Sequence, residues 1–317
     1  MKDMPLVSIV IPVYNGANFM KEAIDSALGQ TYKNIEVIVV NDGSRDDGET
    51  DRIARSYGDR IVYVQKENGG VSSALNVGIK HMRGEYFSWL SHDDMYSPTK
   101  VENQITLLSK FNDPNLIALC GNRQINAKTE FINSGISGKF VENEIISSEE
   151  ALKSLLNVGP FHGCTLLIPK CVFEKCGGFD ERLRYSQDLL MWYKIFLNGY
   201  KLVYSGETDV YGRVHNKQLT QTGKEIFYSD SEKVCEMVLD GFISQTTKKY
   251  RLVYYFAKYN AKYNVKKVRK TAIAQGKKTK TLKLTERIKL SIWGMYGSIR
   301  PTIRKIYYRL FKKVKTQ

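Results

Sequence analysis

Short apolar segments alternate with amphipathic segments over the first third of the chain. Residues 6–13 read LVSIVIPV and residues 35–40 read IEVIVV, and small polar residues follow each of them. Runs of this length, apolar on both faces and rich in Val and Ile, are typical of strands buried in a parallel sheet. Two further strands are predicted at 61–64 and 85–90, and these also stop at polar residues.

The segments between these strands have the spacing of amphipathic helices. The first segment carries its apolar residues on one helical face and ends at Gly29, a residue type that commonly terminates helices. Further helices are predicted up to Tyr57 and around 74–79. Strand–helix units of about 25 residues are typical of βαβ crossovers. The sequence therefore predicts an α/β fold with a Rossmann-like, mostly parallel sheet flanked by helices.

The middle of the chain continues this pattern less regularly. Residues 122–147 are polar and contain Gly without a readable period, and residues 179–185 are predicted to form a loop. Helices are predicted at 98–111, from Ser147 or Ser148 to Leu156, and from Asp188 onward, and strands at 116–121, 163–168, 201–204 and 209–214. No transmembrane helix is expected, because no run of about 18 uncharged apolar residues occurs. A secretory leader is not expected either, because the N-terminus has no small-residue cleavage site.

The polar residues that end the strands are expected to converge. Asn15, Asp42, residues 68–70 and the pair Asp93 and Asp94 each follow a predicted strand. Open parallel sheets bind ligands at the carboxyl ends of their strands, so the topology predicts a nucleotide site there. Gly69 and Gly70 would let the backbone approach a ligand closely. The chain has no GxxxxGK[ST] and no GxGxxG after its first strand, which disfavours P-loop NTPases and dinucleotide oxidoreductases.

Two acidic positions suggest how this site binds its ligand. The adjacent carboxylates of Asp93 and Asp94 could hold Mg²⁺ or Mn²⁺, which would neutralise charge on a departing diphosphate. Alternatively, they form a solvated turn that caps the next helix. Asp42 could accept a hydrogen bond from a base N–H or a ribose hydroxyl, or it could simply stabilise an Asx turn.

Two later residues are candidates for the chemistry itself. Asp188 could act as a general base if it faces the crevice. It could also be an ordinary acid that complements the dipole at a helix N-terminus. His215 could bind a metal or a phosphate, although a single histidine is commonly structural.

Charge is distributed unevenly along the chain. Residues 245–317 contain 22 Lys and Arg against one acid, Glu286, and have a net charge of +21, whereas the remaining residues have a net charge of −6. An apolar stripe runs from Ile288 to Val314 among these basic residues. A basic amphipathic helix is typical of a membrane interface. Packing against the rest of the protein and binding of nucleic acid are the alternatives, and the acidic body disfavours nucleic acid.

The five cysteines bear on the compartment. Their number is odd and most lie in apolar segments, so we expect reduced thiols in a cytosolic setting rather than a disulfide framework. Cys171 and Cys176 have no second pair that would complete a zinc site, so we expect them to be packing residues.

The motifs taken together resemble family 2 glycosyltransferases with the A-type nucleotide-sugar fold, in particular those of bacterial cell-surface polysaccharides. The resemblance covers about residues 5–220. It is carried by VSIVIPVYNG (7–16), VIVVNDGSRD (37–46), ENGGVSSALNVGI (67–79), GEYFSWLSHDD (84–94), GGFDE (177–181), SQDLLMWYKI (186–195) and RVHNKQLT (213–220).

The resemblance implies a role for each matching position. Asp188 is then the base that deprotonates the acceptor hydroxyl in a single-displacement, inverting transfer. Asp94 and His215 are then metal ligands, and Asp42 binds the base, usually uracil. The implied donor-binding residues are Pro12, Tyr14, Asn15, Asp42, Asn68, Gly69, Gly70, Asn76 and Asp93.

We therefore expect a catalytic domain at residues 1–222 and a basic α-helical region at 223–317. The resemblance implies hexosyl or N-acetylhexosaminyl transfer, dependent on Mn²⁺ or Mg²⁺, from a nucleotide-sugar donor. The donor is expected to be a UDP-sugar, and the acceptor a glycan or lipid-linked hydroxyl. The expected location is cytoplasmic, peripheral on the inner face of the cell membrane, with residues 245–317 on its anionic surface. A nucleotidyltransferase and a nucleic-acid-binding protein are the alternative functions.

Overall fold

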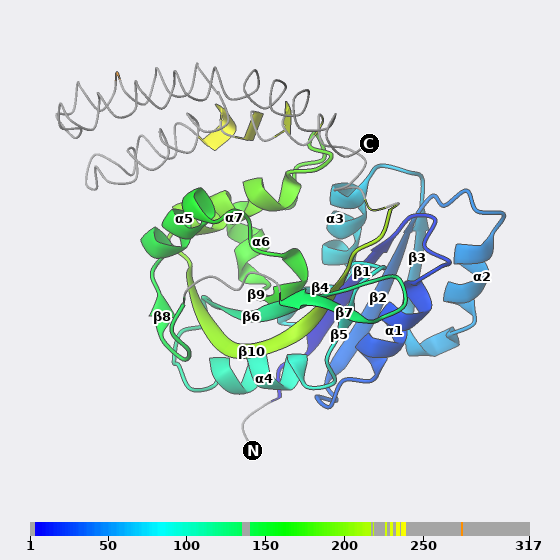
Figure 1. Cartoon of the computed structure of the whole chain (residues 1–317), viewed down its shortest axis with the longest axis horizontal. Helices are drawn as coiled ribbons and strands as arrows, with labels where there is room; N and C mark the ends of the chain where they lie inside the picture. The colour runs from blue at the N-terminus through cyan, green and yellow to red at the C-terminus, as the bar shows by residue number, and fades with distance from the viewer. Residues whose placement is uncertain are drawn as a thin grey trace, which may run out of the picture. The chain divides into compact units, whose positions relative to one another are not determined.

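The chain divides into two compact units. The computed structural model describes residues 4–134, 140–216 and 218, together with separate positions between 226 and 238 and residue 274 (Figure 1). The first unit comprises Met1–Ala151 and Pro160–Asp230, and the second comprises Leu152–Gly159 and Ser231–Gln317. The expected basic region lies almost entirely outside the described residues. Within them, no helix combines the length and the apolar character needed to cross a membrane.

One mixed sheet organises the first unit. In its first half, four strands run parallel in the order β3 (Val62–Lys66), β2 (Ile35–Asp42), β1 (Val7–Val13) and β4 (Tyr86–Trp89). The sheet continues through β9 (Leu166–Pro169), β6 (Leu116–Ile125), β10 (Lys201–Arg213) and β5 (Met95–Tyr96), while β7 (Phe131–Ser134) pairs with β6 and β8 (Ile145–Ile146) with β10. In this second half β6 and β10 are parallel, and the other pairings are antiparallel.

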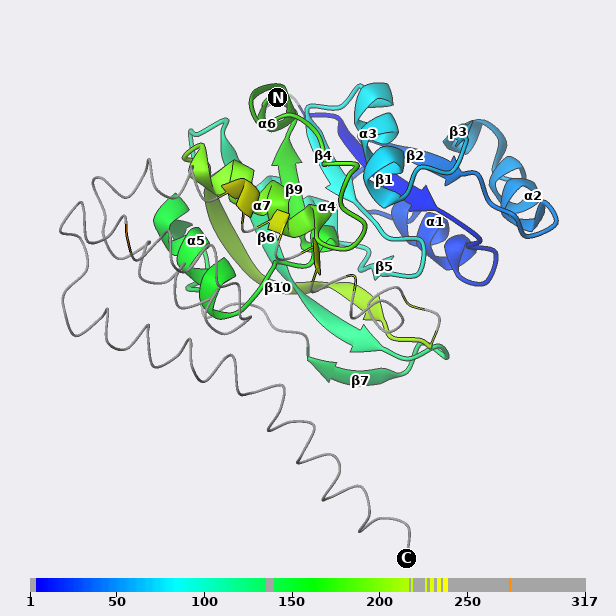
Figure 2. The same ribbon diagram turned by 90° about the horizontal axis from the view of Figure 1, so that it is seen from above.

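Helices cover both faces of the sheet (Figures 1 and 2). They are α1 (Met20–Leu28), α2 (Glu49–Arg55), α3 (Val71–His81), α4 (Lys100–Leu108), α6 (Cys171–Cys176) and α7 (Gln187–Leu197), with 3₁₀ turns at Gly58–Arg60 and Gly163–Thr165. A further helix, α5 (Ser148–Asn157), begins in the first unit and continues into the second. Alternate residues of β1 point to opposite faces. Ile9 and Ile11 therefore join the core formed with α1 and α4, whereas Val10 packs against Gly78 of α3. This buried parallel strand explains the continuous apolar run in the sequence.

The predicted α/β fold is confirmed, with differences in its second half. The predicted strands 201–204 and 209–214 are one strand, β10, because its pairing with β6 shifts register between Tyr204 and Val210 instead of ending. Gly206, at φ +79°, lies within that irregularity. The short strands β5, β7 and β8 and helix α6 were not predicted, because two to six residues are too few for a readable period.

Candidate functional site

Asp42 organises the loop that follows β3. Its carboxylate accepts hydrogen bonds from the backbone N–H groups of Gly69 and Gly70, at 2.9 and 2.7 Å. The side chains of Lys66 and Asn68 donate to the same carboxylate, at 2.7 and 3.3 Å. The structure therefore brings Asp42 together with residues 68–70, as the strand-end argument predicts. Gly43, at φ +67°, permits this packing, because a Cβ there would lie 2.6 Å from the Asn68 nitrogen.

The end of β1 is linked to the neighbouring turn after β2. The Asn15 amide oxygen accepts from the Arg45 N–H at 2.7 Å, and the Asn15 N–H donates to Ser44 Oγ at 2.9 Å. Tyr14 and Asn15 are exposed, whereas Pro12 is buried within the strand. Their expected contacts with a base and ribose stay a prediction.

Asp93 and Asp94, which follow β4, contact different partners. Asp93 Oδ2 lies 3.0 Å from His215 Nε2, so the sheet brings these two predicted residues together. Asp94 is buried, and its Oδ1 accepts the backbone N–H of Arg213 at 2.8 Å. His215 therefore contacts Asp93, and no contact with Asp94 is seen among the described residues.

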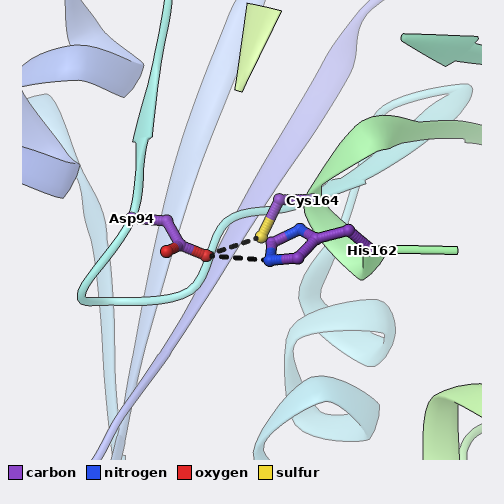
Figure 3. A group of neighbouring side chains, drawn as sticks. All are labelled: Asp94, His162 and Cys164. Carbon is purple, nitrogen blue, oxygen red and sulfur yellow. Dashed lines mark hydrogen bonds and ion pairs between the residues drawn. The ribbon is translucent and has the colours of Figure 1, made fainter. Parts of the chain in front are cut away.

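The second oxygen of Asp94 faces a histidine and a cysteine. Asp94 Oδ2 lies 3.6 Å from His162 Nε2 and 3.4 Å from Cys164 Sγ (Figure 3). These three ligand atoms lie within 4.8 Å of one another. Burial raises the pKa of Asp94, and the nearby Asp93 carboxylate raises it further. Burial and the Asp94 carboxylate raise the pKa of Cys164 well above its ordinary value, so the thiol donates to Asp94 as a neutral group.

Arg213 fixes the turn that contains Asp93 and Asp94 (the acid turn) to three other segments. Its guanidinium is buried and lies 4.5 Å from the Phe19 ring centroid. It donates to Glu22 Oε2 at 2.7 Å, to the Asp93 carbonyl at 2.9 Å, to Thr129 Oγ1 at 3.1 Å and to the Asn126 carbonyl at 3.2 Å. The turn, α1 and the β6–β7 connection are thereby fixed to the end of β10.

Asp188 lies in the first turn of α7. Burial raises the pKa of its carboxyl to about 6, although the Leu189 N–H donates to Asp188 Oδ1 at 2.7 Å. His162 is close enough to Asp188 for its charge to lower that pKa, and it lowers the pKa of Asp94 in the same way. His162 therefore influences both carboxyl groups electrostatically, and it lies 3.6 Å from that of Asp94.

Asn76 contacts protein rather than an open crevice. Its amide nitrogen donates to the Phe179 carbonyl and to Glu181 Oε1, both at 2.9 Å, and its amide oxygen accepts the Phe179 N–H at 2.8 Å. These bonds hold the loop that precedes α7, and the expected contact of Asn76 with a donor stays a prediction.

Sequence reasoning did not single out His162, Cys164 or Arg213 for the site. His162 and Cys164 lie in GPFHGCTLLIP, which has no recognisable ligand spacing around the two residues. Arg213 lies two residues before His215 in the motif RVHNKQLT, and this proximity to a predicted site residue was its signal in the sequence. Cys120, Cys164, Cys171 and Cys176 are free thiols, as expected from the cysteine pattern.

Comparisons with known proteins agree on one family. Residues 8–177 match the family described as Glycosyl transferase family 2. The uncharacterized glycosyltransferase RT0329 of Rickettsia typhi is 49% identical over 249 residues, which cover 77% of this chain and 73% of that protein. The minor teichoic acid biosynthesis protein GgaB of Bacillus subtilis is 32% identical over 186 residues, covering 57% of this chain but 20% of GgaB.

A solved structure shares the fold. The crystal structure of S. aureus TarS residues 1–349 in complex with UDP-GlcNAc superposes with a TM-score of 0.68. The match covers 95% of this chain and 92% of that one, at 15% sequence identity. The similarity at this identity concerns the arrangement of helices and strands.

Proposed function

The chain belongs to glycosyl transferase family 2, and we propose that it transfers a hexosyl or N-acetylhexosaminyl group from a UDP-sugar to an acceptor hydroxyl with inversion. The crystal structure of TarS, which shares the fold, is of a complex with UDP-GlcNAc, and this supports a UDP-sugar donor. GgaB, a relative in teichoic acid biosynthesis, supports a glycan or lipid-linked acceptor of a surface polysaccharide.

One observation carries the proposal. Trp192 of α7 donates its indole N–H to the Phe161 carbonyl at 3.1 Å, and the next residue, His162, lies 3.6 Å from Asp94. The helix that carries Asp188 is therefore bonded to the segment that contacts the acid turn. A carboxyl group with a pKa of about 6 is mostly ionised at neutral pH, and its carboxylate is still basic enough to accept a proton in a transition state. This pairing of a base with strand-end acids suits attack by a hydroxyl on a diphosphate-linked carbon.

The proposed displacement has two simultaneous bond changes. The acceptor oxygen forms a bond to the anomeric carbon while the bond from that carbon to the diphosphate oxygen breaks. The hydroxyl proton passes to the Asp188 carboxylate, and the electron pair of the broken bond leaves with the nucleoside diphosphate. Attack opposite to the leaving group inverts the configuration at the anomeric carbon.

A divalent cation fits the acid turn, and Mn²⁺ fits it better than Mg²⁺. Asp94 Oδ2 and His162 Nε2 lie 3.6 Å apart, and Mn²⁺ accepts both carboxylate and imidazole ligands more readily than Mg²⁺ does. We therefore propose Asp94 and His162 as ligands, with Asp93 and His215 adjoining them. When bound, the cation would offset the negative charge of the leaving diphosphate.

We also propose that residues 245–317 hold the protein at an anionic membrane surface. The net charge of +21 in this region supports electrostatic attachment. A lipid-linked acceptor would then be presented where the donor is bound.

The deciding experiment compares Asp188→Asn with the natural protein. Nucleotide release is measured with UDP-sugars, Mn²⁺ and a bacterial lipid extract, and UDP binding is measured by calorimetry. Asn keeps the oxygen that the Leu189 N–H donates to but is not a base, so turnover should fall about 10²- to 10⁴-fold with UDP affinity unchanged.

Asp59→Asn is the matched control, because Asp59 is an exposed acid in the 3₁₀ turn before β3. It should leave both turnover and affinity unaltered. Normal turnover by Asp188→Asn would refute its role as base. If the natural protein binds no UDP-sugar and releases no nucleotide, the whole proposal is wrong.

A further inference from the structure

Every lone-pair position of the Asp42 carboxylate is occupied. Oδ1 accepts from Lys66 Nζ and the Gly69 N–H, and Oδ2 accepts from Asn68 Nδ2 and the Gly70 N–H. A carboxylate has about four such positions. A base N–H can therefore reach Asp42 only by displacing one of these donors.

Lys66 is the donor that a ligand can displace. The Gly69 and Gly70 donors are backbone groups fixed by the loop, and Asn68 is held by a second bond to the Asp42 carbonyl at 2.8 Å. The Lys66 ammonium lies on a flexible stem, and the Lys66 side chain is 19% exposed, whereas the Asp42 side chain is 4% exposed. Lys66 also donates to the Glu67 carbonyl, which leaves one of its three N–H groups for a further acceptor.

We propose that Lys66 is a specificity-determining residue for the base of the donor, an inference that rests on the proposed function. In the free protein its ammonium occupies Asp42 Oδ1. When the donor binds, the base N–H takes this position, and Lys66 donates to the base carbonyl beside that N–H.

The strand register places this pair side by side. Asp42 and Lys66 are the last residues of the parallel neighbours β2 and β3, and they are direct register partners. An acceptor beside a donor matches a base edge with an N–H beside a carbonyl, as in uracil and thymine. Cytosine presents a ring nitrogen acceptor in place of that N–H, so Asp42 would face another acceptor, and it has an amino donor in place of one of the two carbonyls of uracil.

The test measures UDP and CDP binding by calorimetry to the full chain with Mn²⁺. The natural protein should bind UDP at least about 10-fold more tightly than CDP. Lys66→Met removes the donor, and the ratio of the two affinities should shrink about 10-fold. Lys80→Met, the same change at an exposed position of α3, should leave the ratio unaltered.

A second measurement uses the natural protein and so does not depend on how the variant folds. Sulfur accepts hydrogen bonds weakly. Either 2-thio-UDP or 4-thio-UDP should therefore bind several-fold more weakly than UDP. The analogue that loses affinity identifies the carbonyl that Lys66 contacts.

The outcomes separate this inference from the proposed function. If Lys66→Met keeps the full preference for UDP, or if both thio analogues bind as UDP does, Lys66 only supports the loop and the inference is wrong. The proposed function would survive that result, because UDP still binds. If the natural protein binds neither UDP nor CDP, both proposals fail.

Discussion

The surroundings of Asp94 indicate which cations a site built on this carboxylate would favour. Its Oδ1 accepts from Arg213, and its Oδ2 faces an imidazole nitrogen and a thiol. Hard cations such as Mg²⁺ favour oxygen ligands, whereas Zn²⁺ and Cd²⁺ favour sulfur. Bonds of about 2.0–2.3 Å at a tetrahedral centre place ligand atoms roughly 3.3–3.7 Å apart, near the 3.4 and 3.6 Å seen here. Thiophilic cations should therefore compete for Asp94.

At this scale we predict how transfer responds to metals. EDTA should abolish nucleotide release, and Mn²⁺ should restore it at lower concentrations than Mg²⁺. Cd²⁺ added to the Mn²⁺-loaded protein should inhibit, because it can bind Cys164 and Asp94 together. Cys164→Ser keeps a hydrogen-bond donor to Asp94 but removes the sulfur, so it should raise the inhibitory Cd²⁺ concentration at least about 10-fold.

Cys120→Ser is the control for that experiment, because Cys120 is a buried thiol that donates to the Thr165 carbonyl. It should leave Cd²⁺ inhibition unaltered. Full activity of the natural protein in EDTA would contradict the proposed metal requirement itself.

At the scale of elements, Lys100 joins β4, β5 and α4 behind the acid turn. Its ammonium is buried, donates to Ser88 Oγ at 2.5 Å and lies 4.2 Å from the Tyr96 ring centroid. Desolvation lowers its pKa to about 8, against the opposing influence of Cys120, Cys164 and Asp209. The two strands that flank the acid pair and the helix that follows them thus meet at a buried, partly compensated positive charge.

We predict that this lysine makes stability depend on alkaline pH. Because the folded-state pKa is below the unfolded value of 10.5, the unfolded chain binds more protons between pH 8 and 10.5. The free energy of unfolding should therefore rise across this window, by at most about 1.4 kcal/mol per pH unit from this group. Lys100→Met should lose this contribution in urea titrations at pH 7.5 to 9.5.

Lys110→Met is the matched control, because Lys110 is exposed just beyond the end of α4. Titration of tyrosines and of exposed lysines is common to the three proteins and cancels in the comparison. An identical pH slope in Lys100→Met and the natural protein would show that Lys100 does not titrate in this range.

At this scale, the strands that form one edge of the site were predictable from the sequence, whereas the position of His162 was not. Strands β1 to β4 were predicted because each is an apolar run that stops at polar residues, and those residues form the edge that holds Asp42, Asp93 and Asp94. His162 could not be predicted there, because β9 pairs antiparallel with β4 and brings its preceding turn to Asp94, which is 68 positions away in the sequence. Such pairings depend on topology rather than on local periodicity.

At the scale of the whole molecule, opposite charges separate along the chain. The basic residues of 245–317 contrast with the net negative charge of the remainder. Each basic residue near an anionic surface contributes about 1 kcal/mol to membrane affinity. A protein with this distribution should bind a membrane through one region and leave the other free to bind the donor.

We predict that the full chain floats with vesicles containing phosphatidylglycerol and remains unbound with phosphatidylcholine alone. Gln replacement of six basic residues should weaken binding about 10⁴-fold, and high salt should weaken that of the natural protein. The six are Arg300, Arg304, Lys305, Arg309, Lys312 and Lys313.

Gln replacement of six exposed lysines on the first unit is the control, and it should leave vesicle binding almost unaltered. These are Lys21, Lys33, Lys80, Lys110, Lys128 and Lys175. Equal losses from the two sets would indicate attraction by total charge instead of by residues 245–317.

The hydrogen bond from the Arg213 backbone N–H to Asp94 can form only late in the synthesis of the protein. These two residues are 119 positions apart. At a synthesis rate of about 5–20 residues per second, roughly 6–24 s pass between their emergence. During that interval β1 to β4 can already pair, but the carboxylate that faces His162 lacks the donor that orients it. A nascent chain that stalls before β10 therefore contains a partly built sheet in which the proposed metal-binding carboxylate is not yet oriented. Only the synthesis of β10 supplies the N–H that orients it.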